Sequence, residues 1–192
     1  MMDRERAVAI EAAFSDAIRL HDRAMRQDAG ALAAIADAVA RAMAAGGKVL
    51  ACGNGGSAAD SQHFAAELVG RFTRERRALP ALALTTDTSI LTAVGNDYGY
   101  ERVFARQVEA FGRPGDILMG ISTSGRSKNV LAAFAAARDR QMTTVALTGS
   151  DGGPIGAAAD LHLNVPSSSS ARVQEVHRTV LHVICELVEA GI

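Results

Sequence analysis

Two short segments rich in glycine and small polar residues have the composition of anion-binding loops. The first runs from Gly53 to Ser57 and contains Asn54, Gly55 and Gly56. Glycines let the backbone approach a ligand closely, and the Asn54 and Ser57 side chains offer hydrogen bonds. The segment has neither the ending of a P-loop nor the spacing of a dinucleotide fingerprint. A tight structural turn and a ligand site therefore both stay open for it.

The second segment carries four hydroxyl groups within six residues. Ser122, Thr123 and Ser124 are consecutive, and Ser127 follows after Gly125 and one further residue. Hydroxyl donors, backbone N–H groups and the positive end of a helix dipole together favour binding of a phosphate. An ordinary helix N-cap is the alternative, but it would need only one of these hydroxyls. We therefore predict a phosphate site here.

A histidine and a carboxylate follow the first segment at helical spacing. His63 and Glu67 are four residues apart, so both project from one helix face and could share a metal ion or a substrate hydroxyl. A surface ion pair is the alternative, but the helix that carries them begins at the anion segment, which favours function. The last helix offers Gln174, His177 and His182, and spacing alone does not decide which histidine faces a site.

The elements that would position these residues alternate between strand and helix. Strand patterns occur at 48–52, 80–84, 116–122, 143–148 and 161–165, and helical patterns occur at about 58–72, 88–95, 101–111, 127–139 and 171–190. This alternation predicts an α/β fold, a three-layer αβα sandwich with a mostly parallel five-stranded sheet. Ligands in such folds lie beyond the carboxyl ends of the strands, where both segments fall.

Two more helices are expected before the first strand. They run from about Arg4 to Arg26 and from Ala31 to Ala45, and Ile10, Phe14 and Ile18 share one stripe of the first. These helices exceed the cover that a single sheet needs. Because they would otherwise expose apolar stripes, we predict a homo-oligomer.

Length, charge and cysteine content narrow the functional class. We expect one domain over residues 1–192, with 1–46 as its helical N-terminal part. The net charge is −1 with no basic stripe, which argues against binding to nucleic acid. Cys52 and Cys185 lack the spacing of a thiolate zinc site or a disulfide framework. With no signal peptide and no apolar run of about 20 residues, we expect no membrane association and a cytoplasmic location.

Six motifs resemble those of the phosphoheptose isomerases, which belong to the sugar-isomerase (SIS) domain class. They occur in that family's order and spacing over nearly the whole chain: CGNGGSAAD, QHFAAELVGRF, VGNDYG, GISTSGRS, LTGSDGG and RVQEVH…H. The resemblance implies isomerisation of sedoheptulose 7-phosphate to D-glycero-D-manno-heptose 7-phosphate, the first step of nucleotide-activated heptose biosynthesis. It also implies a homotetramer and one zinc ion per subunit.

The resemblance further implies which residues form the site. Those that would bind the sugar-phosphate substrate are Asn54, Gly55, Gly56, Glu67, Asn96, Asp97, Ser122, Thr123, Ser124, Ser127 and Gln174. Those that would bind zinc are His63, Glu67, Gln174 and His182. It selects His182 over His177, with Glu67 and His182 as the proton-transfer pair. A carboxylate that coordinates zinc is a poorer base, so both roles of Glu67 stay open.

Two other functions compete with catalysis. One SIS branch binds the DnaA replication initiator without catalysis, but it departs from the isomerase pattern at the positions of Glu67 and His182, which this chain keeps. Sugar-phosphate sensing modules of regulators carry a DNA-binding extension, for which the sequence offers no motif. Arg71 and Arg126 lie near the two loops, and we leave them outside the predicted site.

Overall fold

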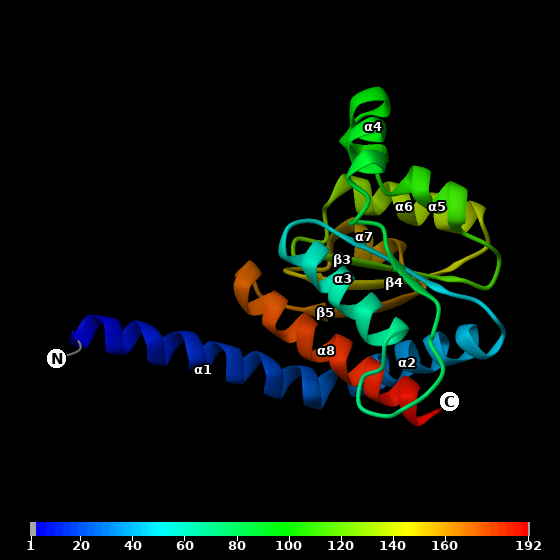
Figure 1. Cartoon of the computed structure of the whole chain (residues 1–192). Coiled ribbons are helices and arrows are strands. Elements are labelled where there is room, and N and C mark those ends of the chain that lie inside the picture. Colours follow the sequence, from blue (N-terminus) through cyan, green and yellow to red (C-terminus); the bar gives the residue numbers. More distant parts are fainter. Residues whose placement is uncertain (1–2, 192) are drawn as a thin grey trace.

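Five strands form one sheet in which every neighbouring pair is parallel. The computed structural model describes residues 3–191 of the chain (Figure 1). The strands follow the order β2-β1-β3-β4-β5 and are β1 Val49–Gly53, β2 Ala81–Ala83, β3 Ile117–Ser122, β4 Thr143–Gly149 and β5 Leu161–Val165. The predicted parallel αβα sandwich is confirmed.

Both faces of the sheet are buried, which explains its nearly continuous apolar strands. The helices are α1 Arg4–Gln27, α2 Ala29–Ala44, α3 Gly56–Val69, α4 Thr88–Tyr98, η1 Tyr100–Arg102, α5 Ala105–Phe111, α6 Lys128–Asp139, α7 Gly153–Ala158 and α8 Ser170–Ala190. Val49 and Ala51 of β1 pack with α2, α3 and α8, whereas Leu50 and Cys52 pack with α5, α6 and α7. Alternate residues of a strand therefore serve opposite layers.

The two predicted N-terminal helices are present, and the first stands away from the sheet (Figure 1). Asp3 caps α1 by accepting a hydrogen bond from the Glu5 backbone N–H. Leu20 is the one buried residue among the 24 residues of α1. The amphipathic sequence of α1 thus leaves most of its apolar stripe uncovered in the single chain.

One short helix was not predicted from the sequence, and the helix predicted at 101–111 is divided into η1 and α5. The unpredicted helix, α7, spans only six residues that include Gly153, Pro154 and Gly156. A helix this short shows no apolar repeat, and its glycines and proline are typical of a turn. The helix predicted at 58–72 instead begins at Gly56 and ends at Val69.

A buried carboxylate holds the chain where it leaves α3. Glu189 of α8 accepts hydrogen bonds from the backbone N–H groups of residues 72–74 at 2.7–3.0 Å and from Arg76 Nε at 3.0 Å. Arg76 Nη2 in turn donates to the Glu67 carbonyl oxygen at 2.8 Å. Burial raises the pKa of Glu189, but the backbone donors and the Thr73 hydroxyl outweigh it and lower this pKa to about 2. We call Glu189, residues 72–74 and Arg76 the loop knot.

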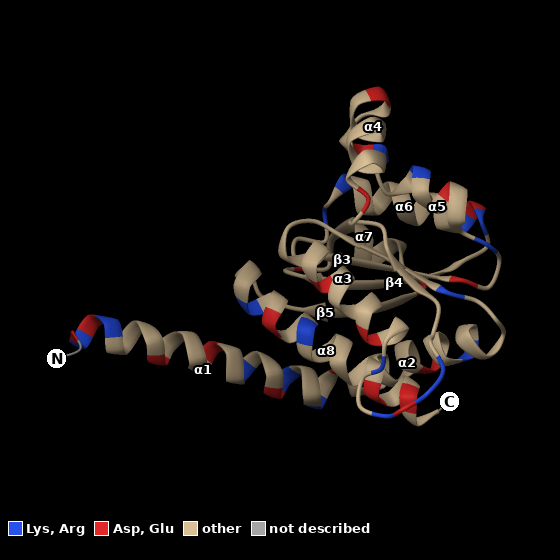
Figure 2. Cartoon of the chain, in the orientation of Figure 1, with Lys and Arg blue, Asp and Glu red and all other residues tan. Residues whose placement is uncertain are grey.

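Charged residues of both signs are interspersed along the elements (Figure 2). The sequence carries 20 Lys and Arg against 21 Asp and Glu, so neither sign dominates. Among residues 3–191, no helix combines the length and the apolar character needed to cross a bilayer.

Candidate functional site

The two predicted anion loops lie side by side because their strands are neighbours. β1 pairs with β3 in parallel, with Cys52 opposite Gly120 and Gly53 opposite Ile121. Each strand therefore ends at the same edge of the sheet, and each loop leads into the N-terminus of a helix, α3 or α6. The first turn of a helix exposes unpaired N–H groups, so this edge favours an anion.

The Gly53–Ser57 loop requires glycine at two positions for different reasons. Gly55 has φ +57°, a conformation that residues with a Cβ atom rarely adopt. At Gly56, a Cβ atom would lie 2.5 Å from Gln174 Nε2, so any side chain would displace that amide. The loop thus brings the start of α3 against α8 and places Gln174 beside it.

The second loop places its hydroxyls in three different environments. Ser122 Oγ and Ser127 Oγ are 2.9 Å apart, and Thr123 Oγ1 lies 3.2 Å from Ser170 Oγ at the start of α8. Ser124 is exposed. Ser127 is the N-cap residue of α6, but its side chain makes no capping hydrogen bond. The ordinary N-cap explanation therefore fails for this hydroxyl, whose hydrogen bond goes to Ser122 instead.

His63, Glu67 and His182 meet where α3 packs against α8. His63 Nε2 lies 2.8 Å from His182 Nε2 and 3.4 Å from Glu67 Oε1. One ligand atom from each side chain fits within 4.8 Å of the other two, and all three residues are partly buried. Two imidazole nitrogens and a carboxylate oxygen are a donor set that zinc accepts. His182, the third member of the group with His63 and Glu67, thus comes from a helix more than 100 residues further along the chain.

The structure separates the two candidate histidines of α8. His177 is fully buried, and its Nε2–H donates to the Thr148 carbonyl oxygen at 2.9 Å. Removal from water lowers the pKa of His177 to about 4, so the ring is neutral near pH 7. It faces β4, whereas His182 faces His63 and lies 5.5 Å from the Phe72 ring, measured between centroids. His182 is therefore the histidine that joins the cluster.

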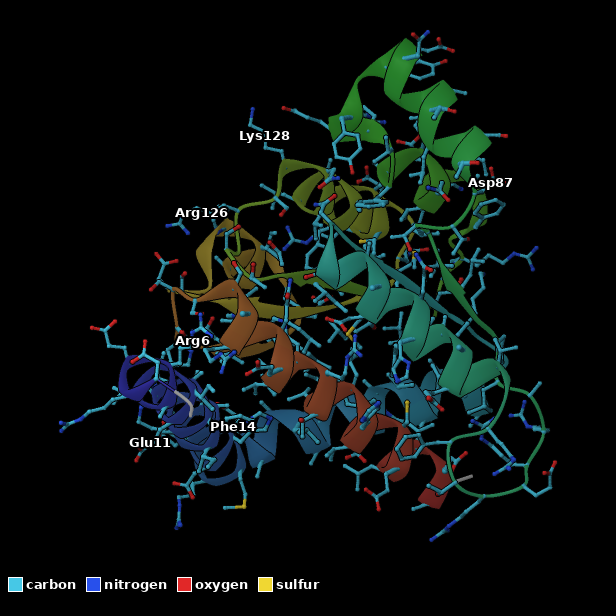
Figure 3. The ribbon with its side chains drawn as sticks, turned by 60° about the vertical axis from the view of Figure 1, so that its left-hand side comes forward. Arg6, Glu11, Phe14, Asp87, Arg126 and Lys128 are labelled. Atoms are coloured by element: carbon cyan, nitrogen blue, oxygen red, sulfur yellow. The ribbon has the colours of Figure 1, made fainter. Side chains whose placement is uncertain are left out.

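Asn96, Asp97, Arg71 and Arg126 make their polar contacts with residues outside this cluster. Asn96 and Asp97 are exposed near the end of α4, where Asn96 Nδ2 donates to Asp97 Oδ1 at 2.8 Å. Figure 1 shows α4 projecting away from the sheet. Arg71 lies 3.9 Å from Glu75, and Arg126 makes two contacts of 2.8 Å with Asp151 at the periphery of the molecule (Figure 3). None of these contacts involves His63 or Glu67.

Sequence reasoning missed the side chains that support the site. Asn129 exchanges two hydrogen bonds with Asn54, and the Tyr100 hydroxyl donates to Asn54 Oδ1. The loop knot holds the C-terminal end of α3 just beyond Glu67. The bonds of Asn54 with Asn129 and Tyr100, and those of Glu189 with residues 72–74, join segments far apart in sequence, and no local spacing signals them.

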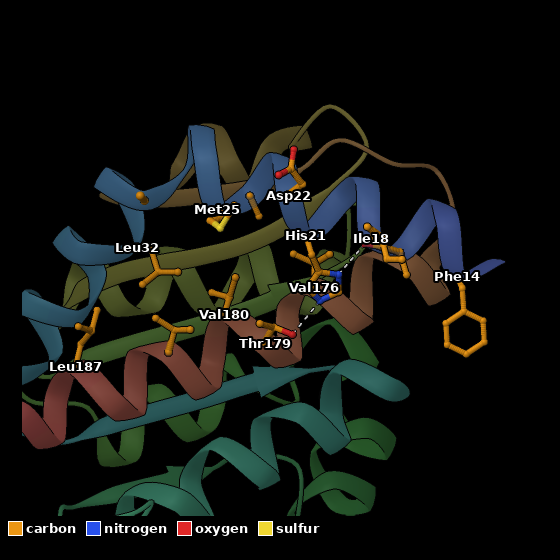
Figure 4. A pocket seen from close by; sticks show the side chains of 14 residues that line it. Phe14, Ile18, His21, Asp22, Met25, Leu32, Val176, Thr179, Val180 and Leu187 are labelled. Atoms are coloured by element: carbon orange, nitrogen blue, oxygen red, sulfur yellow. Dashed lines mark hydrogen bonds between the residues drawn. The ribbon is translucent and has the colours of Figure 1, made fainter. Parts of the chain in front are cut away.

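A large cavity has a lining that includes none of His63, Glu67 and His182. It is an apolar groove of about 840 Å³ between α1 and α8, which we call the α1 groove (Figure 4). Phe14, Ile18 and Met25 contribute to it from α1, and Val180 and Leu187 contribute from α8. Phe14, Ile18 and Met25 are each about two-thirds exposed. These side chains form an exposed apolar surface, which does not suit a charged sugar phosphate.

The comparisons with known proteins agree on one family. The family model described as SIS domain matches residues 14–149. A phosphoheptose isomerase of Roseiflexus sp. is 62% identical over 167 residues, which cover 87% of this chain and 85% of that protein. The solved phosphoheptose isomerase of Neisseria gonorrhoeae superposes with a TM-score of 0.90 at 47% identity, and that of Francisella tularensis with 0.93 at 40%. Each superposition covers 96% of this chain and 98% of the other.

Proposed function

The chain belongs to the phosphoheptose isomerases of the SIS-domain family, and on this basis we propose that it converts sedoheptulose 7-phosphate to D-glycero-D-manno-heptose 7-phosphate. The observation that carries the assignment to particular residues is the convergence of His63, Glu67 and His182, two of which lie on the helix that the first loop opens. The product would enter the biosynthesis of nucleotide-activated heptose.

The proposed reaction moves a proton between adjacent carbons of the sugar. A base removes a proton from C1 of the ketose, an enediolate forms, and an acid delivers a proton to C2. We assign these steps to Glu67 and His182, which approach one another from α3 and α8. His63 Nε2 and His182 Nε2 are 2.8 Å apart, so without a metal ion one ring donates to the other and His63 orients the His182 ring.

We propose that His63, Glu67, Gln174 and His182 hold one zinc ion per subunit. His63, Glu67 and His182 are supported by their ligand atoms, two nitrogens and one oxygen that lie within 4.8 Å of one another. Gln174 is included because the family resemblance implies it. When bound, zinc would polarise the substrate oxygens as a Lewis acid.

We propose that the second loop, residues 122–127, binds the substrate phosphate. Ser122, Thr123, Ser124 and Ser127 stand at the N-terminus of α6, and the Ser127 hydroxyl is not used as a cap. Asn54, Gly55 and Gly56 would contact the sugar from the neighbouring loop, and Asn96 and Asp97 would contact it from α4.

We further propose that the protein is a tetramer, that each chain forms one domain, and that it is located in the cytoplasm. The α1 groove and the exposed stripe of α1 support self-association, since a second copy would remove this apolar surface from water. The single domain proposed over residues 1–192 includes Met1, Met2 and Ile192, which lie outside the described residues. Binding of the DnaA initiator is not favoured, because the chain retains Glu67 and His182 and its relatives are isomerases.

Substitution of the proton-transfer pair tests this function. Glu67→Gln and His182→Asn should each lower kcat for sedoheptulose 7-phosphate by about 10²-fold or more, the cost of a lost general acid or base. His177→Asn is the matched control on the same helix and should retain kcat. Circular dichroism and oligomeric state must match those of the unmodified protein.

Zinc content measured on the same variants separates the two roles of Glu67 and His182. Activity lost together with zinc indicates a ligand role, and activity lost with zinc retained indicates direct proton transfer. Loss of turnover in His177→Asn but not in His182→Asn would contradict the assignment.

A further inference from the structure

Two asparagine side chains join the loop after β1 to the helix after β3. Asn54 Nδ2 donates to Asn129 Oδ1 at 2.9 Å, and Asn129 Nδ2 donates to Asn54 Oδ1 at 2.9 Å. Asn129 is only 4% exposed and is the second residue of α6. It lies two residues beyond Ser127, so this pair links the two segments proposed to bind the substrate.

The surroundings fix which way each amide points. The Val130 backbone N–H lies 3.0 Å from one terminal atom of the Asn129 side chain. Because a backbone N–H can only donate, that atom is the amide oxygen. The amino group of Asn129 therefore faces Asn54 and requires an acceptor there. This places the Asn54 oxygen toward Asn129 and leaves no freedom to exchange oxygen and nitrogen.

The hydrogen bonds of Asn54 leave it a single polar group for a ligand. The Tyr100 hydroxyl donates to Asn54 Oδ1 at 3.1 Å, beside the bond from Asn129. An amide oxygen accepts two hydrogen bonds, so both of its lone pairs are used. Asn54 Nδ2 carries two hydrogens, and one points to Asn129 Oδ1. The second N–H is what the side chain can present to a substrate.

We propose that Asn129 is a positioning residue that holds Asn54 as a hydrogen-bond donor toward an oxygen atom of the sugar phosphate. The inference rests on the proposed function and adds the polarity of one contact and the residue that sets it. Hydroxyl, carbonyl and phosphate oxygens of the substrate all accept such a bond. Without Asn129, the Asn54 amide could rotate and turn its oxygen toward substrate oxygens, where lone pairs would face lone pairs.

Steady-state kinetics with sedoheptulose 7-phosphate test this proposal. Asn129→Leu removes both hydrogen bonds, whereas Asn129→Asp keeps the acceptor and loses the donor to Asn54 Oδ1. Each should raise KM about tenfold or more, the effect of one lost hydrogen bond to a charged or strongly polar group, with kcat little changed. In an Asn54→Ala background, Asn129→Leu should raise KM no further, because Asn129 acts only through Asn54.

Lys128→Gln is the matched control. Lys128 is the exposed neighbour of Asn129 on α6 and pairs with Glu101, so its replacement should leave KM unchanged. Melting temperature and circular dichroism identify folded variants. Two outcomes overturn the proposal: both Asn129 variants with the KM of the unmodified enzyme, or an equal effect of Asn129→Leu with and without Asn54.

Asn54→Asp keeps the proposal testable if both Asn129 variants fail to fold. Aspartate offers only acceptors, so its KM should exceed that of Asn54→Ala, and an equal or lower KM would overturn the donor assignment. An unmodified enzyme that does not turn over sedoheptulose 7-phosphate would refute the proposed function, and this inference with it. An active enzyme whose KM is unaffected at Asn129 would refute the inference alone.

Discussion

Replacing Glu189 with glutamine should destabilise the protein by an amount that depends on pH. The Glu189 carboxylate accepts bonds from the N–H groups of residues 72–74 and from Arg76. Glutamine would keep one acceptor oxygen and turn an amino group toward these donors. Both the charge and half of the acceptor capacity would be lost, while side-chain size would be nearly retained.

The pKa of Glu189 gives the size of the effect. It falls from 4.5 to about 2 on folding, a change of about 2.5 units. At 1.36 kcal/mol per unit this corresponds to roughly 3 kcal/mol. Residues 73 and 74 of the loop knot are exposed, so solvent screening reduces the expected loss for Glu189→Gln to about 2 kcal/mol.

The sign of the pH dependence follows from the lowered pKa. The stabilisation is fully present above pH 4.5, where the unfolded carboxyl is also ionised, and it is lost as the pH falls through 2. The difference in unfolding free energy between the two proteins should therefore shrink by about half between pH 7 and pH 3.

Urea unfolding at fixed protein concentration measures this difference, since an oligomer's stability depends on concentration. Glu186→Gln, an exposed position on the same helix, serves as the control and should show no difference at either pH. A difference in unfolding free energy between Glu189→Gln and the unmodified protein that stays constant from pH 7 to pH 3 would show that packing, and not the carboxylate charge, stabilises the loop knot. Equal unfolding free energies of the two proteins at pH 7 would refute the reasoning altogether.

Three further predictions concern the second loop at residues 122–127, the α1 groove and the buried His177. Ser122→Ala combined with Ser124→Ala should raise KM for the sugar phosphate, since each lost bond to a charged group is worth roughly 1.5–3 kcal/mol; unchanged KM and kcat would remove these hydroxyls from the site. Phe14→Asp combined with Ile18→Asp should lower the mass measured by light scattering by burying charge in the interface, and a stable monomer of the unmodified chain at micromolar concentration would contradict self-association. His177 has a pKa lowered from 6.5 to about 4, so its contribution to stability is present above pH 6.5 and lost as the pH falls toward 4. The unfolding free energies of His177→Asn and the unmodified protein should therefore converge between pH 7 and pH 4.5, and a constant difference would count against a neutral folded ring.

The sequence predicts the sheet better than it predicts the contacts of the site. The strand expected at 161–165 has those same bounds, and the ends of the other four shift by at most one residue. Strands buried on both faces give strong apolar runs, and each is bounded by glycine or polar turns. The helix α7 gives no such signal, because its six residues include two glycines and a proline.

In the candidate site, too, residues grouped locally in the sequence are predictable, whereas long-range contacts are not. His63 and Glu67, and the hydroxyls from Ser122 to Ser127, are recognisable because helical spacing or a local cluster groups them. The bond between Asn54 and Asn129 joins residues 75 positions apart, and the Phe72–Glu189 bond spans 117 positions. Such pairings arise from the topology of the sheet and the packing of α3 on α8, for which no local pattern exists.

The choice between the two histidines of α8 shows how tertiary packing decides what spacing leaves open. At about 100° per residue, His177 and His182 point roughly 140° apart around the helix, and Gln174 lies between their directions, so neither is excluded. Glu189, seven residues beyond His182, returns to within about 20° of it. The stripe that bears His182 and Glu189 faces α3 and the loop after it, whereas His177 faces the Thr148 carbonyl of β4. One face of α8 therefore both supplies His182 to the cluster and anchors, through Glu189 and Arg76, the end of the helix that carries His63 and Glu67.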